Sequence, residues 1–247
     1  LNQIAGRYAV RHCAETAIVA TLVARSMGIE GADLATIALG AMTMNVGLMR
    51  QIEQFQHRDS ALLPDERALI ERHPVESADM LRCAGVEDAQ WIECVLLHHE
   101  KADGSGYPEG RQEAAIPDAA RLISAADRYC ACVSARNYRR SMLPPLALDK
   151  LREEAVTAAD QALADLFGER IGAYPPGALV RLANGEIGVV SRRDEVHVLI
   201  DADGAAPATP TRRDSAMPAC AIVEALLEDQ LRLRFSMKTV WGELASL

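Results

Sequence analysis

The stretch from His98 to Pro108 combines metal-binding residue types with a glycine-rich turn. Its sequence is His98-His99-Glu100-Lys101-Ala102-Asp103-Gly104-Ser105-Gly106-Tyr107-Pro108. Imidazole and carboxylate groups bind iron, manganese and zinc, and such ions activate water and offset charge when a phosphodiester is cleaved. A lone histidine on an apolar helix is more often a hydrogen-bonded core residue, so the interpretation of this stretch depends on its companions elsewhere in the chain.

Three further segments contain histidine, acid or arginine residues of the same kind. They are Arg11-His12, Glu71-Arg72-His73-Pro74, and Ala126-Asp127-Arg128-Tyr129 with the tail Ser134-Ala135-Arg136-Asn137-Tyr138-Arg139. In order and approximate spacing, the four segments resemble the motifs of the HD-GYP family, bacterial metal-dependent phosphodiesterases that hydrolyse cyclic di-GMP. The resemblance implies a mainly α fold, the HD-superfamily helical bundle. It also implies the metal ligands His12, His73, His98, His99 and Asp127.

One motif departs from the family. Where the family has His-Asp-x-Gly-Lys, this chain has Met44-Asn45-Val46-Gly47-Leu48. In the family the aspartate bridges two metal ions; the amide of Asn45 is neutral, and the thioether of Met44 is a soft ligand suited to copper(I). Leu48 removes a lysine that contacts the substrate phosphate, and Cys130 replaces a ligand-contacting acid. We therefore expect that no catalytic set is intact.

The remaining ligands predict one divalent metal ion. By the resemblance, one metal position keeps only His12 and Asp127, whereas the other keeps His73, His98 and His99. Three imidazoles with an open position are found in catalytic zinc sites. We therefore expect a single iron, manganese or zinc ion at the three histidines and no two-metal centre.

Two segments are candidates for binding. By the resemblance, Arg136 and Arg139 occupy positions whose side chains bind the phosphates of the cyclic dinucleotide in the family. The two parallel N–H groups of a guanidinium match the geometry of a phosphate. The alternative is two solvated surface arginines. In the family, the glycine-rich loop borders the active site and contacts diguanylate cyclase domains; alternatively it is only a tight turn in which glycine supplies positive φ. The residues of this loop are Asp103, Gly104, Gly106, Tyr107 and Pro108.

Two functions from different classes fit these residues. The first is a degenerate HD-GYP domain that binds cyclic di-GMP, a related cyclic dinucleotide or a signalling partner, with little or no hydrolysis. The second is an active cyclic di-GMP phosphodiesterase that runs on one metal or recruits Glu53 or Asp33 in place of the lost pair. Some family members hold a third metal through a glutamate one turn before the first histidine, but Tyr8 stands there.

Composition narrows the class of protein. The chain has 247 residues, of which 49% are hydrophobic and only 4% aromatic, and this favours a helical core of aliphatic side chains. A net charge of −9 argues against a nucleic-acid polymer as partner. Six cysteines without CxxC spacing, and no apolar run approaching the roughly 18 residues of a membrane span, predict a cytoplasmic protein without membrane insertion. The chain begins in mid-pattern, so we expect a sensor or receiver domain upstream.

Hydrophobic periodicity predicts the helices that carry these residues. We expect helices over 7–27, from Asp33 to about Met49, through His73, over 75–83, over about 87–100, from Pro117 to about Val133, and over about 146–166. The helix over 87–100 would place His98 and His99 at its end.

After residue 172 the sequence pattern changes from helical periodicity to turn-forming residues and short predicted strands. A breaker cluster at 174–177 precedes a predicted hairpin of 179–182 and 187–190, a third strand near 196–200 and a mobile loop over 201–216. We therefore expect two domains, an HD-GYP-like helical domain over 1–172 and a small C-terminal subdomain with a β-hairpin over 173–247.

Overall fold

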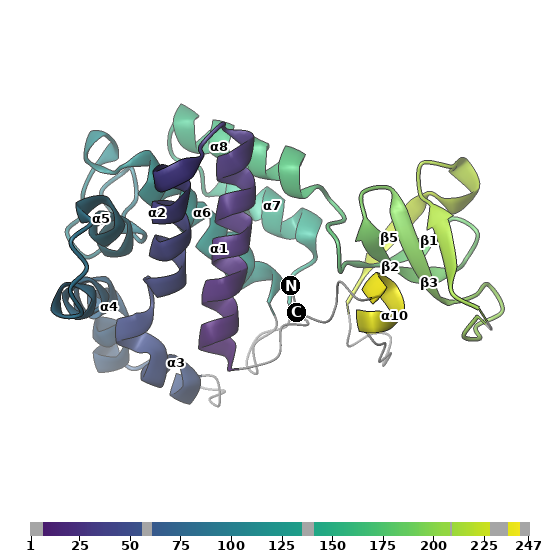
Figure 1. The fold of residues 1–247 in the computed structure, drawn as a ribbon, viewed down its shortest axis with the longest axis horizontal. Coiled ribbons are helices and arrows are strands. Elements are labelled where there is room, and N and C mark those ends of the chain that lie inside the picture. The colour runs from purple at the N-terminus through teal and green to yellow at the C-terminus, as the bar shows by residue number, and fades with distance from the viewer. Residues whose placement is uncertain (1–6, 56–60, 135–140, 208, 228–236, 243–247) are drawn as a thin grey trace.

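The computed structural model describes residues 7–55, 61–134, 141–207, 209–227 and 237–242. Figure 1 shows the helices of residues 8–171 packed together on one side and the strands in a small sheet on the other. The helical elements are α1 (Tyr8–Ser26), α2 (Gly31–Thr43), η1 (Val46–Leu48), α3 (Met49–Phe55), α4 (Pro64–Cys83), α5 (Ala89–Leu97), η2 (Glu113–Ala115), α6 (Asp118–Val133), α7 (Pro144–Glu153), α8 (Ala158–Ile171), η3 (Pro218–Cys220) and α10 (Met237–Trp241). The predicted class, a mainly α bundle with a small strand-containing part, is confirmed. The division into two domains at residue 172 stays a prediction.

Small residues let the central helices pack closely. α1 turns Ala17 and Ala20 into the main core, and Figure 1 shows α1 and α2 side by side. A Cβ at Gly40 of α2 would lie 3.0 Å from side-chain atoms of both Cys94 of α5 and Ile123 of α6. This close packing of α2 fixes the position of α5, which His98 and His99 follow, and of α6, which carries Asp127.

α4 continues through Pro74, so the prediction of two short helices around His73 is wrong. Proline lacks the amide hydrogen that would bond to the carbonyl of Ile70, four residues earlier, and normally kinks or ends a helix. Here another group uses that carbonyl, because Nδ1 of His73 lies 2.5 Å from the oxygen of Ile70. The helix therefore passes through the proline without leaving this carbonyl unbonded.

Two further helix boundaries differ from the prediction. α2 begins after Glu30 and ends at Thr43, so Asp33 lies in its first turn and does not cap it. The predicted helix over 146–166 is two helices, α7 and α8. α8 begins with a capping box in which Thr157 and Asp160 bond each other's backbone amides, a signal for a new helix that the apolar pattern concealed.

The strands form one antiparallel sheet in the order β4-β3-β2-β1-β5. They are β1 (Leu179–Leu182), β2 (Ile187–Arg192), β3 (Glu195–Ile200), β4 (Thr211–Asp214) and β5 (Ile222–Leu226). The first three were predicted. Part of the predicted mobile loop is instead the edge strand β4, where Arg213 bonds the two carboxylate oxygens of Glu186 at 2.6 and 2.7 Å. Its charged sequence gives no hydrophobic alternation, which is why the pattern missed it.

One stretch, Gly31–Ile52, is long and apolar enough to cross a membrane by length and composition alone. In the structure it is divided among α2, η1 and α3, and α2 buries Thr36, Ile37, Gly40 and Ala41 in the bundle. Core helices of globular proteins pass the same test of length and composition, so this stretch is weak evidence for a membrane span.

Candidate metal centre

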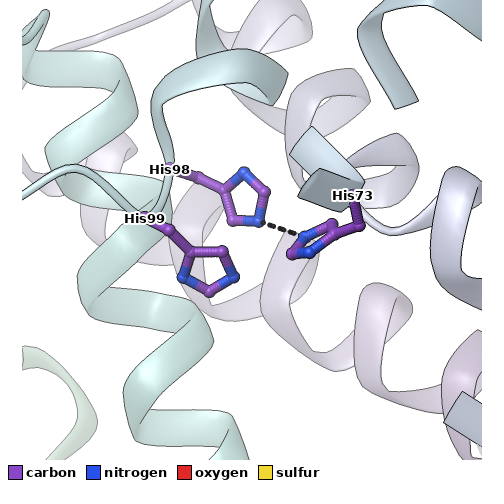
Figure 2. A group of neighbouring side chains, drawn as sticks. All are labelled: His73, His98 and His99. Carbon is purple, nitrogen blue, oxygen red and sulfur yellow. Dashed lines mark hydrogen bonds between the residues drawn. The ribbon is translucent and has the colours of Figure 1, made fainter. Parts of the chain in front are cut away.

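Three histidines, one in α4 and two directly after α5, converge on one point. His73 lies in the middle of α4, and His98 and His99 directly follow α5. Figure 2 shows the three rings gathered together, with His73 and His98 facing each other. One ligand nitrogen of each histidine lies within 4.8 Å of the other two, and the Nε2 atoms of His73 and His98 are 3.2 Å apart. Within the described part of the chain, no other histidine, cysteine or acidic residues form such a group.

Backbone carbonyls fix the orientation of two rings. Nδ1 of His98 lies 2.7 Å from the carbonyl oxygen of Val95, and Nδ1 of His73 lies 2.5 Å from that of Ile70. A carbonyl oxygen only accepts, so each Nδ1 donates and each neutral ring keeps the Nε2 lone pair for the centre of the group. Metal-binding histidines are commonly held in this way through their second nitrogen.

Burial keeps the three imidazoles neutral. It lowers the pKa of His73 from 6.5 to about 3, and the neighbouring His98 adds to the effect. Burial also lowers the pKa of His98, and burial together with His98 lowers the pKa of His99 well below 6.5. Two neutral rings that face each other with lone pairs repel, and a cation between them removes that repulsion. The donor set therefore fits a divalent ion.

The other two predicted ligands, His12 and Asp127, bond to each other. Nε2 of His12 on α1 lies 2.6 Å from Oδ1 of Asp127 on α6. Burial acts to raise the pKa of Asp127, but the hydrogen bond and charge of His12 outweigh it and hold this pKa well below its usual range. The structure thus gathers three of the five predicted ligands and pairs the remaining two.

The residues at the substituted motif are part of the core. Met44 is fully buried in the main hydrophobic cluster, and Leu48 and Cys130 are buried as well. The side-chain amide of Asn45 donates to the sulfur of Cys13 at 3.8 Å. Burial raises the pKa of that thiol to about 11, so Cys13 stays protonated at neutral pH. These side chains fill space where ionised or metal-binding groups stand in the family motif.

A buried acid that the sequence did not single out holds the loop after His99. Glu100 is 4% exposed, and its carboxylate accepts hydrogen bonds from the backbone amides of Glu109 at 2.7 Å and Arg111 at 2.9 Å. The ring of Tyr107 lies against His99, with ring centroids 4.7 Å apart. In the sequence an acid beside two histidines resembles a ligand. Only the fold shows that both of its oxygens are committed to the loop.

The loop itself is a tight turn. Asp103 accepts hydrogen bonds from the amide and hydroxyl two residues on, and Gly104 has a φ of 77°. Gly106 is required by a close approach, because a Cβ there would lie 2.5 Å from the carbonyl oxygen of His99. The peptide between Tyr107 and Pro108 is cis. The structure therefore gives these residues a turn role, and their role towards a partner stays a prediction.

Other predicted residues lie away from this centre or outside the described residues. Arg136 and Arg139 are outside the described residues, and so is the side chain of Glu53. Asp33 is exposed in the first turn of α2, about 15 Å along the helix from its last residue, Thr43, after which Met44 and Asn45 follow. Its recruitment as a substitute ligand is therefore wrong. Tyr8 stacks on His12, with centroids 5.5 Å apart.

The helical part of the chain matches a known family. The sequence model of the HD domain matches residues 3–163, which is more than half of the chain. The chain belongs to the HD-domain family. The family resemblance inferred from the sequence motifs is therefore confirmed for the HD domain.

Relatives of this HD-domain chain include named phosphodiesterases. Cyclic di-GMP phosphodiesterase PA4108 of Pseudomonas aeruginosa is 29% identical over 183 residues, which is 74% of this chain and 44% of that protein. Cyclic di-GMP phosphodiesterase response regulator RpfG of Xanthomonas campestris is 31% identical over 168 residues, 68% of this chain and 40% of that protein. The chain thus spans less than half the length of these relatives.

A solved structure shares the fold. Bd1817, described as an HDG"Y"P protein from Bdellovibrio bacteriovorus, aligns with a TM-score of 0.55 and 20% identity over 66% of this chain and 52% of that chain. At this identity the likeness concerns the arrangement of the helices alone.

Proposed function

We propose that this HD-domain chain binds one divalent metal ion and a cyclic dinucleotide, with little or no hydrolysis. The contrast between the two halves of the site supports this most strongly. Three neutral imidazoles converge at one half, whereas at the other half Nε2 of His12 hydrogen-bonds Oδ1 of Asp127 directly. The named relatives, which are cyclic di-GMP phosphodiesterases, support the class of ligand.

The histidine group retains one part of a phosphodiesterase and lacks others. A divalent ion held by His73, His98 and His99 would supply Lewis acidity and positive charge towards a phosphoryl oxygen. The chain offers no carboxylate at Asn45 to be shared by a second ion and no cation at Leu48. Losing such groups removes several kcal/mol of transition-state stabilisation, and each ~1.4 kcal/mol is a factor of ten in rate.

Restoration of the motif tests the lack of hydrolysis. The variant Met44→His, Asn45→Asp, Leu48→Lys should hydrolyse cyclic di-GMP faster than the wild type by several factors of ten. Met42→His provides a matched control in the last turn of α2, just before the motif, because Met42 is 44% exposed. A wild type as fast as the restored variant would instead establish the alternative, an active phosphodiesterase running on one metal.

Binding of the dinucleotide is proposed for Arg136 and Arg139. Charge-assisted hydrogen bonds from arginine contribute about 1.5–3 kcal/mol each, and the net charge of −9 opposes an anionic ligand. We expect salt-sensitive affinity in the micromolar range, weakened by Arg136→Ala, in titration calorimetry. If the wild type binds no cyclic dinucleotide, docking of a diguanylate cyclase domain on the loop of residues 103–108 becomes the leading function.

A further inference from the structure

A cavity of about 320 Å³ lies where the helical bundle meets the sheet, the two parts that Figure 1 shows beside each other. Its wall combines the second half of α1, the end of α6, the residues before α7, the end of α8 and the adjoining ends of β1 and β5. The segment 175–178, which leads into β1, also lines it. The histidines of the candidate metal centre are not part of this wall, so the cavity is a separate site.

The wall of this cavity is mainly apolar, with a buried and an exposed part. Val19, Tyr129 and Leu226 line it and are buried, whereas Ile18 is 52% and Leu22 is 50% exposed. Removal of such apolar surface from water is favourable. An apolar ligand would therefore contact the buried part of the wall and cover the two exposed side chains at its mouth.

A single charged side chain faces the cavity. Among the described residues of the wall, only Arg170, in the last turn of α8, carries a charge; the other polar side chains are the hydroxyls of Tyr129 and Ser141. Arg170 is exposed, and its guanidinium forms no ion pair or hydrogen bond with any residue that the structure describes. A guanidinium offers two parallel N–H donors that match a carboxylate. Arg170 is thus available to an anionic group at the cavity.

The size of the cavity favours a small molecule over a protein segment. Sites for small molecules have volumes of about 300–1,000 Å³. One turn of an α-helix with its side chains, about 10 Å across and 5.4 Å long, would fill roughly 400 Å³ and so exceeds the whole cavity. A single positive charge in a chain of net charge −9 also disfavours an anion that carries several charges.

We infer that this cavity binds a fatty acid, whose chain contacts the apolar wall and whose carboxylate pairs with Arg170. The wall belongs to both the helices and the strands, so a bound fatty acid holds the sheet against the bundle. Because the ligand binds only the folded chain, it also raises the free energy of unfolding. The site is independent of the metal centre and goes beyond the proposed function.

Titration of the full chain with dodecanoate, kept below its micelle concentration and followed by amide NMR shifts, tests the site. We expect saturable shifts at Val133, Ala178 and Ala225 in the wall. Dodecanol, which has the same chain without the charge, should bind about tenfold or more weakly. Arg170→Gln should remove this difference. Arg82→Gln is the matched control, because Arg82 also lies in the last turn of a helix but forms an exposed ion pair in α4.

A second pair of variants tests the mouth of the cavity. Leu22→Glu places an acid beside the bound carboxylate and should weaken dodecanoate about tenfold or more. Val10→Glu is its control on the same helix, because Val10 is 50% exposed and does not line the cavity. Melting temperatures of the ligand-free variants check that both fold. His98→Ala should bind dodecanoate like the wild type, which separates this site from the metal centre.

Absence of shifts at the wall amides, equal affinity for dodecanoate and dodecanol, or equal losses in Arg170→Gln and Arg82→Gln would overturn the inference. Binding to phosphatidylcholine vesicles without any response to dodecanoate would assign the exposed apolar residues to a membrane surface and would also overturn it. A dimer in light scattering that Leu22→Glu dissociates, again without a response to dodecanoate, would assign them to a second copy of the chain with the same consequence.

Discussion

Replacement of Pro74 by alanine should stabilise the fold and weaken metal binding at the same time. An alanine at this position supplies the amide hydrogen that α4 lacks, and that hydrogen bonds to the carbonyl of Ile70. The same carbonyl orients His73 through Nδ1 at 2.5 Å. The backbone amide therefore competes with the imidazole for one oxygen.

The gain in folding stability and the loss of metal affinity are of comparable size in free energy. Proline inside a helix costs ~3 kcal/mol relative to alanine. Pro74 is buried, and loss of about two methylene groups returns roughly 1.6 kcal/mol of that gain. The net increase in the free energy of unfolding is about 1–2 kcal/mol, or roughly 3–6 °C in melting temperature for a chain of this size. Loss of the hydrogen bond that orients a ligand typically lowers metal affinity ~10–100-fold.

Thermal melts of the chelator-treated protein and competition titrations with zinc measure the two effects. Pro64→Ala is the matched control, because Pro64 occupies the first turn of the same helix, where a missing amide hydrogen costs nothing. It should change neither quantity much. A Pro74→Ala variant with unchanged zinc affinity would refute the role of the Ile70 carbonyl in orienting His73.

Three further predictions follow from the site. Glu100→Ala should leave the backbone amides of Glu109 and Arg111 without an acceptor, which lowers the free energy of unfolding by about 2–4 kcal/mol and speeds hydrogen exchange at these amides. The control Glu109→Gln, at a half-exposed ion pair, should lower it by less than ~1 kcal/mol, and equal effects of the two variants would contradict the role of Glu100 in holding the loop. Chelator should shift the melting temperature little, because the core is aliphatic; extensive loss of helical circular dichroism would show that the ion is structural. The metal-free fold should lose stability as the pH falls, because burial lowers the pKa of His73 from 6.5 to about 3 and the unfolded chain takes up its proton first. That stability is complete above about pH 6.5 and declines towards pH 3, so urea midpoints that do not change between about pH 7 and pH 5 would contradict it.

Local patterns in the sequence predicted most of the helices, but they failed where side-chain hydrogen bonds decide whether a helix continues or restarts. Helical periodicity located α1 and α6 within a residue or two, because each buries one apolar face over four or more turns. It failed at Pro74, where a side chain satisfies the backbone from within the same helix. It failed again at Thr157, where a polar cap restarts a helix inside a continuous apolar pattern.

The candidate site was predictable as a set of residue types but not as a geometry. The motif order placed His73 near His98 and His99, and the structure brings them within 4.8 Å. Nothing in the sequence distinguishes Glu100, which holds the loop, from an acid that binds metal. That distinction depends on two backbone amides nine and eleven residues away, which only the fold brings into reach.

Metal content per chain tests the central claim most directly. We expect the wild type, purified without chelator and analysed by mass spectrometry of its metals, to hold one divalent ion per chain and His98→Ala to hold none. Exposed Met42→His should match the wild type. Two ions per chain in the wild type, or one ion retained in His98→Ala, would contradict the account.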